Sequence, residues 1–238
     1  MVVDQFSPET LYSSGDCIRF KYSENDVSAC DVLLAKEHAL TLYVNGQALY
    51  NFVCSPAQFA ELCIGWLCGE GYIRSVADVK ELHISEDGHK VNVILPDIRR
   101  RETAAFATYT APDIILLEKT AHALKKEDNI YTRTRSTHGC AFGARNEPLV
   151  FCEDISRYNA LDKTIGTVLL RGESLREGIV FSSGRIFAKM VEKVVRSGIP
   201  VLASKAAATE DAIAAANRYR QTLLFFADSC SFIQSNVT

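Results

Sequence analysis

The fold of this chain is decided by the stretch Glu153-Asp154-Ile155-Ser156-Arg157-Tyr158-Asn159-Ala160-Leu161-Asp162-Lys163-Thr164-Ile165-Gly166. The apolar residues just before it, 149–152, are typical of a short buried strand, and the residues from Asn159 onward place their apolar side chains on one stripe of a helix. Small molecules bind beyond the carboxyl ends of the strands in an open α/β sheet, so this charged strand-to-helix turn is predicted to face a ligand. A solvated first turn capped by Asp154 or Ser156 is the alternative.

A second polar turn, Ser182-Ser183-Gly184-Arg185, follows another apolar run and precedes another amphipathic helix. Glycine lets a ligand approach the backbone, a helix start offers free N–H groups, and Arg185 carries a fork of donors suited to phosphate. Two such turns in successive β-α units predict an anion site. A capped helix start is the ordinary alternative for this turn taken alone.

Composition narrows the function classes. The chain has 238 residues, 47% of them hydrophobic, which is enough for a substantial core. Its net charge of -3 argues against binding to nucleic acid. We find no signal peptide and no apolar run long enough to span a membrane, so we expect a cytoplasmic protein.

Eight cysteines raise the question of metal or sulfur chemistry, but no two have Cys-x-x-Cys spacing and none forms a zinc-finger pattern with histidine. We therefore expect no protein-bound metal. Cys63 and Cys68 fall in an apolar helix and are assigned to the core. Cys140 lies two residues after His138, which makes it a candidate sulfur carrier. Burial in the strand 139–142 is the alternative that we favour.

The order of patterns predicts an α/β protein, α+β overall, with two lobes in one compact domain. Residues 1–110 form a mixed, largely antiparallel lobe, with a type I′ hairpin at Asn45-Gly46, a helix opened by a capping box from Ser55 to Gln58, and a second hairpin over 79–95. Residues 111–238 form an α/β lobe. In it a helix starts at Ile114, and from Thr137 strands alternate with helices, which predicts parallel pairing.

These motifs together resemble those of the formate dehydrogenase accessory sulfurtransferase family (FdhD). The resemblance rests mainly on residues 153–166 and on Ser183-Gly184-Arg185. Further matches follow in order along most of the chain: Val44-Asn45-Gly46, Ser55-Pro56, Glu61-Leu62, Ile64-Gly65, Glu70-Gly71-Tyr72-Ile73, Met190-Val191, Lys193, Gly198-Ile199-Pro200-Val201-Leu202 and Thr209. It implies a cytidine-deaminase-like layered α/β sheet in the C-terminal half, although the zinc signature of the deaminases is absent.

The resemblance also implies a function. Members of the family take sulfur from a cysteine desulfurase, carry it as a persulfide on a Cys-x-x-Cys loop, and pass it to the molybdenum or tungsten pterin cofactor of formate dehydrogenase. This chain departs from the pattern, because Phe106-Ala107-Thr108-Tyr109-Thr110-Ala111-Pro112 stands where the loop is expected and holds no cysteine. Arg135 and Tyr158 also replace a family glycine and a family histidine.

Two functions of different classes follow. The first is sulfur transfer to molybdopterin guanine dinucleotide during maturation of formate dehydrogenase. The second is non-catalytic binding of that cofactor, or of a guanine nucleotide, by a protein that has lost the transfer. A homodimer is left open. Under either function the predicted binding residues are these: His138, Asp154, Arg157, Asn159, Asp162, Lys163, Ser183, Gly184, Arg185 and Phe226.

Specific roles are assigned to several of these residues. Arg185 would grip a phosphate together with the N–H groups around Ser183 and Gly184, while Asp154 and Asp162 would accept hydrogen bonds from a base or ribose. A purely structural network is the alternative. In it Lys163 and Arg157 pair with Glu153 and Asp162.

Overall fold

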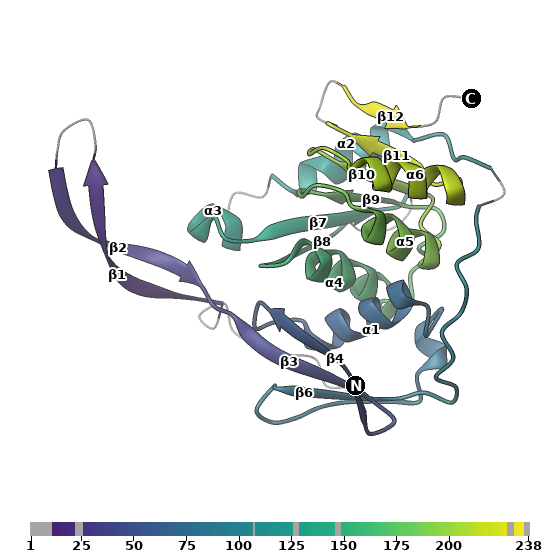
Figure 1. Ribbon diagram of the computed structural model, residues 1–238, viewed down its shortest axis with the longest axis horizontal. Helices are drawn as coiled ribbons and strands as arrows, with labels where there is room; N and C mark the ends of the chain where they lie inside the picture. Colours follow the sequence, from purple (N-terminus) through teal and green to yellow (C-terminus); the bar gives the residue numbers. More distant parts are fainter. Residues whose placement is uncertain are drawn as a thin grey trace.

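The computed structural model describes residues 11–21, 26–106, 108–125, 129–145, 149–227 and 231–235. Within these residues three sheets are present, of two, four and six strands. The four-stranded and six-stranded sheets enclose a layer of helices, and the two-stranded hairpin projects from the body (Figure 1). The mixed α/β class predicted from the sequence is confirmed, whereas the cytidine-deaminase-like arrangement stays a prediction.

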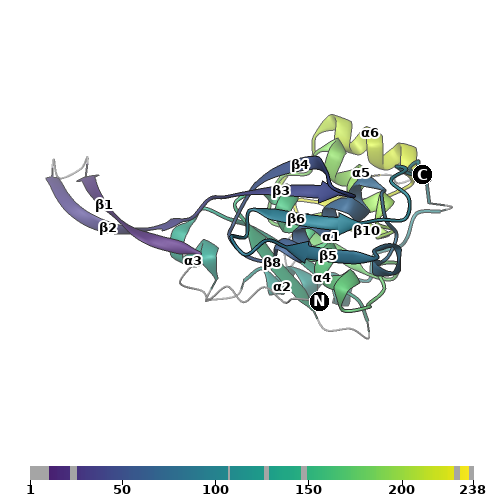
Figure 2. The same cartoon turned by 90° about the horizontal axis from the view of Figure 1, so that it is seen from below.

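The four-stranded sheet has the order β4-β3-β6-β5 and is seen face-on in Figure 2. Its outer pairs are antiparallel and its central pair, β3 and β6, is parallel. Asn45 and Gly46 both have positive φ, 50° and 80°, as the predicted type I′ turn requires. The strands are β3 (His38–Val44), β4 (Gln47–Cys54), β5 (Glu81–Ile84) and β6 (Lys90–Ile94), with a short 3₁₀ helix, η2 (Val76–Asp78), before β5.

The six-stranded sheet has the order β12-β11-β10-β9-β7-β8. The predicted alternation is confirmed for four strands, because β8, β9, β10 and β11 run the same way and α4, α5 and α6 connect them. The prediction is wrong for β7, which lies antiparallel between β8 and β9. The short connection over 144–149 can join only antiparallel neighbours. The strands are β7 (His138–Gly143), β8 (Val150–Asp154), β9 (Ile179–Ser182), β10 (Val201–Ser204), β11 (Thr222–Phe225) and β12 (Ile233–Ser235).

Helices cover both faces of the six-stranded sheet. The inner face carries α4, α5 and α6, and α1 packs between these helices and the four-stranded sheet (Figure 1). One buried apolar cluster runs from the four-stranded sheet through α1 to this inner face, and a smaller one lies under α2 on the outer face. The helices are α1 (Phe59–Glu70), α2 (Ile114–Ala123), α3 (Ile130–Thr134), α4 (Arg157–Leu170), α5 (Ala188–Arg196) and α6 (Glu210–Tyr219). None of the helices in the described ranges is long and apolar enough to cross a membrane.

The start of α1 differs from the predicted capping box. Gln58 is the N-cap in the left-handed conformation, with φ of 58°, and makes no side-chain capping bond. The Ser55 hydroxyl instead accepts a hydrogen bond from the N–H of Ile155, 3.2 Å away, and the Gln58 amide contacts Cys152. The residues of the predicted box therefore make contacts to β8 and the turn after it.

Helices α1 and α4 touch backbone to backbone at two glycines. A Cβ atom built on Gly65 would lie 1.7 Å from the carbonyl oxygen of Asp162, and one built on Gly166 would lie 1.9 Å from the carbonyl oxygen of Glu61. No side chain fits in either place, because the blocking atoms are backbone rather than movable side-chain ends. These two glycines fix how closely α1 and α4 approach each other.

Replacing Gly65 by alanine is expected to lower the free energy of unfolding by about 3 kcal/mol, because the added methyl group forces α1 and α4 apart. Gly69→Ala in the same helix is the matched control. Its Cβ would lie 3.1 Å from Cγ of the Lys193 side chain and would meet no backbone atom, so it should cost clearly less than Gly65→Ala. Chemical denaturation measures both variants, and equal stabilities would contradict the close helix contact.

Candidate functional site

A pocket of about 500 Å³ opens at the edge of the six-stranded sheet where β8 and β9 end. His138, the first residue of β7, lies between these strand ends because β7 pairs with both strands. The first turn of α4 forms one wall, and Arg185 and Phe187 after β9 form the other. We call this space the cation pocket, because the cationic side chains of Arg157 and Arg185 line it. It lies at the sheet edge where the sequence analysis expects a ligand.

Two arginine side chains converge on one aromatic ring in the cation pocket. The guanidinium carbon of Arg157 lies 5.2 Å from the centre of the Phe187 ring, and that of Arg185 lies 5.8 Å from it. Among the described residues, no carboxylate forms an ion pair with either guanidinium. Neighbouring cations without a counter-ion repel each other, and an anion between them removes that repulsion. The pocket is thus suited to a negatively charged ligand.

The amino end of α4 adds positive potential to the same pocket. Ser156 is its N-cap, but the serine side chain makes no capping hydrogen bond. Ser156, Arg157 and Tyr158 all line the pocket. The N–H groups of a first helical turn have no partner within their own helix, and the aligned peptide dipoles place partial positive charge there. Such a helix end is a ready site for phosphate.

His138 is held neutral at pH 7. Burial lowers the pKa of its ring, the guanidinium groups of Arg157 and Arg185 lower it further, and the carboxylate of Asp154 opposes them only in part. Gly184 makes room for this arrangement, because a Cβ atom there would lie 3.4 Å from His138 Nδ1 and 3.3 Å from the Cβ of Arg157. Gly184 therefore serves the packing of two pocket side chains.

A second pocket, of about 330 Å³, adjoins the first and shares His138 with it. Arg135 and Lys205 bring two more cations to its wall. Glu153 also lines it, but its carboxylate already accepts hydrogen bonds from two N–H groups at the start of α3 and from the hydroxyl of Thr137. The positive surface thus extends from the amino end of α4 across His138 to α3.

Three of the predicted binding residues belong to a buried network instead of the pocket wall. Lys163 Nζ lies 2.6 Å from Asp154 Oδ2, and both side chains are fully buried. Asp154 also accepts hydrogen bonds from the N–H groups of Ser55 and Ser156 and from the amide of Asn159, all at 2.9 Å. This corrects the role predicted for Asp154, whose oxygens have no room for a base or ribose. The network ties the loop before α1 to the start of α4.

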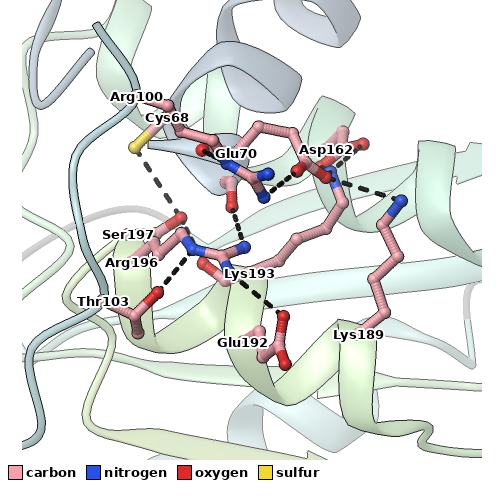
Figure 3. Close-up of polar contacts among 11 residues, drawn as sticks. Cys68, Glu70, Arg100, Thr103, Asp162, Lys189, Glu192, Lys193, Arg196 and Ser197 are labelled. Atoms are coloured by element: carbon pink, nitrogen blue, oxygen red, sulfur yellow. Dashed lines mark hydrogen bonds and ion pairs between the residues drawn. The ribbon is translucent and has the colours of Figure 1, made fainter. Parts of the chain in front are cut away.

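Asp162 lies in a second buried network on the other side of α4 (Figure 3). Its two carboxylate oxygens each lie 2.9 Å from Lys193 Nζ, and Glu70 lies 3.4 Å from the same nitrogen. Burial raises the pKa of Asp162 to about 6 although Lys193 opposes that rise. Asp162 therefore joins α4 to α5 and α1 and does not reach the pocket. The alternative of a structural network is the better description of these charges, although the pairs differ from the predicted ones. Lys163 pairs with Asp154 instead of Glu153, and Asp162 pairs with Lys193 instead of Arg157.

The backbone N–H groups predicted to grip phosphate around Ser183 and Gly184 are already used. The N–H of Ser183 donates to the carbonyl of Gly139 at 2.9 Å, and the N–H of Gly184 donates to the hydroxyl of Ser182 at 3.2 Å. Helix α5 begins only at Ala188. The backbone at Ser183 and Gly184 is therefore not free to bind an anion, which corrects that part of the prediction. The amino ends of both α4 and α5 border the pocket, since Phe187, the N-cap of α5, lines it together with Arg185.

Phe226 and Cys140 have opposite environments. Phe226 is 51% exposed, with φ of 52°, and lies at the same sheet edge but outside both pocket walls. Cys140 lies in β7 with no exposed surface, and burial raises the pKa of its thiol. A buried protonated thiol is neither accessible nor nucleophilic, so the structure corrects Cys140 as a sulfur-carrying candidate.

The segment that stands where the family loop is expected lies at the opposite edge of the sheet. Thr110 exchanges hydrogen bonds with the hydroxyl of Thr222, the first residue of β11. The N–H of Phe106 donates to the carbonyl of Tyr219, and Ala107 is outside the described residues. This edge holds the amino ends of the parallel strands, whereas the cation pocket lies at their carboxyl ends.

The predicted binding residues do not include Phe187 or the two further cations of the positive surface, Arg135 and Lys205. Lys205 follows the end of β10 as Arg185 follows the end of β9, and this repetition is a signal that the sequence does contain. Phe187 shows no such signal, because its pattern is that of an ordinary core position. No group of His, Cys, Asp and Glu side chains in the described part of the chain could hold a metal ion.

Comparison with known proteins places this site in a family. The sequence model of the FdhD/NarQ family matches residues 35–114 and 97–233. A protein of Methanothermobacter thermautotrophicus named "Sulfur carrier protein FdhD" is 32% identical over 77% of this chain and 81% of its own length. A protein of Bacillus subtilis with the same name is 28% identical over 90% of this chain and 92% of its own length.

The fold agrees with these sequence matches. A crystal structure of a candidate formate dehydrogenase accessory protein from Desulfotalea psychrophila superposes with a TM-score of 0.82. The superposition covers 95% of this chain and 97% of the Desulfotalea chain. The two sequences are 24% identical, so this likeness concerns the fold alone. The family match extends over the four-stranded and six-stranded sheets and includes every residue that lines the cation pocket. The chain therefore belongs to the FdhD/NarQ family.

Proposed function

We propose that this chain is a sulfur carrier for the maturation of formate dehydrogenase and that its cation pocket binds molybdopterin guanine dinucleotide or a guanine nucleotide. The names of its relatives support the first part. The second rests on one observation, the two arginines beside the amino end of α4 with which no carboxylate of the described residues forms an ion pair. A cysteine desulfurase and formate dehydrogenase are the partner proteins in this proposal. The cytoplasm is its compartment, which suits the seven free cysteines of the described residues.

The residues present fit a diphosphate. Each guanidinium group can give a pair of charge-assisted hydrogen bonds to phosphate oxygens, and the helix end adds backbone donors. His138 lies beside both arginines and can take up a proton when negative charge arrives. The bound cofactor would supply the metal centre that receives sulfur, while the chain's own residues hold the phosphates.

The second candidate function is cofactor binding without sulfur transfer. It is favoured by the absence of cysteine from residues 106–112 and by the burial of Cys140. Both candidates use the cation pocket in the same way. They differ only in whether an accessible thiol elsewhere on the chain accepts sulfur.

Replacing Arg185 or Arg157 by alanine is expected to weaken the binding of guanosine diphosphate by about 10- to 100-fold, because each charge-assisted contact contributes about 1.5–3 kcal/mol. Isothermal titration calorimetry measures the dissociation constants. Arg145→Ala is the matched control, since Arg145 pairs with Asp113 beyond the other end of β7 and should leave binding unchanged. Wild-type affinity in the folded Arg157→Ala/Arg185→Ala double variant would overturn the pocket assignment.

As the pH falls from about 8 to about 6, the wild type is expected to gain affinity for the nucleotide relative to His138→Gln. In the free protein, burial and the two arginines lower the pKa of His138, and a bound diphosphate raises that pKa. Between the two values binding takes up a proton, so lower pH favours the complex. The phosphates titrate alike in both proteins, and parallel pH profiles would show that His138 does not face the ligand.

A further inference from the structure

Two cysteines face each other across the projecting hairpin of β1 (Tyr12–Lys21) and β2 (Asp26–Ala35). In the antiparallel register Cys17 lies directly opposite Cys30. Residues opposite each other in such a pair have their Cα atoms about 4.5–5.5 Å apart and their side chains on the same face. This spacing falls within the range that a disulfide spans. The register therefore creates a dithiol from residues that are far from Cys-x-x-Cys spacing.

These two thiols are also the accessible ones among the described cysteines. Cys17 and Cys30 are partly exposed, whereas the other five are buried: Cys54, Cys63, Cys68, Cys140 and Cys152. Burial raises the pKa of Cys68 to about 11 and raises the pKa of Cys152 as well. Protonated thiols in a core cannot attack a sulfur donor. Cys230 lies outside the described residues, and the experiment below includes it.

The hairpin reaches away from the positive surface while its base stays beside it (Figures 1 and 2). Arg133 of α3 donates a hydrogen bond to the Tyr12 hydroxyl at 3.0 Å and lies over the Tyr12 ring. Asn129, Tyr131 and Arg135, in and beside α3, line the second pocket. At about 3.3 Å per residue, Cys17 lies about 17 Å along the strand from Tyr12. The dithiol thus projects into solvent, where a large protein donor can reach it.

A cation lies on the same face of the hairpin as the two cysteines. Arg19 is two residues beyond Cys17 on β1, so its side chain points to the same face as the two cysteines. Ser28 lies opposite Arg19. A guanidinium group beside the dithiol attracts a negatively charged persulfide sulfur.

We propose that Cys17 and Cys30 form the sulfur-carrying dithiol of this chain, an inference that rests on the sulfur-carrier function proposed above. The thiolate of one cysteine attacks the terminal sulfur of the donor's persulfide. A new S–S bond forms on the hairpin, the donor's S–S bond breaks, and the donor leaves as a thiolate. The thiolate of the second cysteine then attacks the inner sulfur of the new persulfide. This closes the Cys17–Cys30 disulfide and releases hydrosulfide with the electron pair, and a thiol reductant restores the dithiol by a two-electron reduction.

The experiment loads the purified full chain with sulfur from a cysteine desulfurase and cysteine, then locates persulfides by alkylation and peptide mass spectrometry. We expect one added sulfur atom on the peptide of Cys17 or Cys30. Cys17→Ser/Cys30→Ser should abolish the loading, while Ser28→Ala, on the same face of the hairpin, should leave it intact. One single variant, Cys17→Ser or Cys30→Ser, should keep the persulfide longer and release less hydrosulfide, because it lacks the resolving thiol.

Several outcomes would overturn the inference. They are sulfur on Cys230 or on a buried cysteine with none on the hairpin, undiminished loading in the double variant, and no loading anywhere on the chain. Measuring guanosine diphosphate binding on the same preparations distinguishes failure of the dithiol inference from failure of the proposed function. A chain that binds the nucleotide through Arg157 and Arg185 but accepts no sulfur is the non-catalytic binding protein. If the chain loads sulfur on Cys17 or Cys30 but binds no nucleotide, the dithiol inference stands and the proposed nucleotide binding by the cation pocket is wrong.

Discussion

The close contact of α1 with α4 at Gly65 and Gly166 is the constraint on which the rest of the structure depends. Because the two backbones touch, the residues flanking the contact on α4 are sealed from water, and charged side chains there need partners. Asp154 and Lys163 pair with each other on one side, and Asp162 pairs with Lys193 on the other. These pairs fix the position of α4 between α1 and the six-stranded sheet. The direction of its amino end follows, and with it the place of Arg157 in the pocket.

The charged residues around this contact and at the pocket thus fall into two groups with different roles. Those inside the protein are neutralised by neighbours, while Arg157 and Arg185 share a ring and have no carboxylate partner among the described residues. Unpaired cations at a helix amino end oppose folding slightly through their repulsion, and a bound anion relieves it. This local imbalance supports the ligand class proposed above, one with phosphate groups. The hairpin dithiol gives the proposed carrier a separate place for sulfur.

Much of the fold follows from the sequence, because periodicity and turn residues act locally. The Asn45-Gly46 hairpin and the run of strands and helices after β8 are of this kind. The antiparallel insertion of β7 and the exposed position of the Cys17–Cys30 pair depend on strand register, which spacing along the chain does not reveal. At the site, Arg185, Arg157 and His138 were predictable as polar residues at strand ends. The burial of Asp154 and Asp162 was not, since a carboxylate at a strand end or within a helix has the same local sequence pattern whether it meets solvent or a buried lysine.

The most direct test of the central claim is a crystal structure of the chain with bound guanosine diphosphate. The account predicts the diphosphate between the guanidinium groups of Arg157 and Arg185, against the amino end of α4, with His138 beside it. Asp154 and Asp162 should keep their lysine partners and make no contact with the nucleotide. A nucleotide bound elsewhere, with both arginine side chains untouched, would contradict the account.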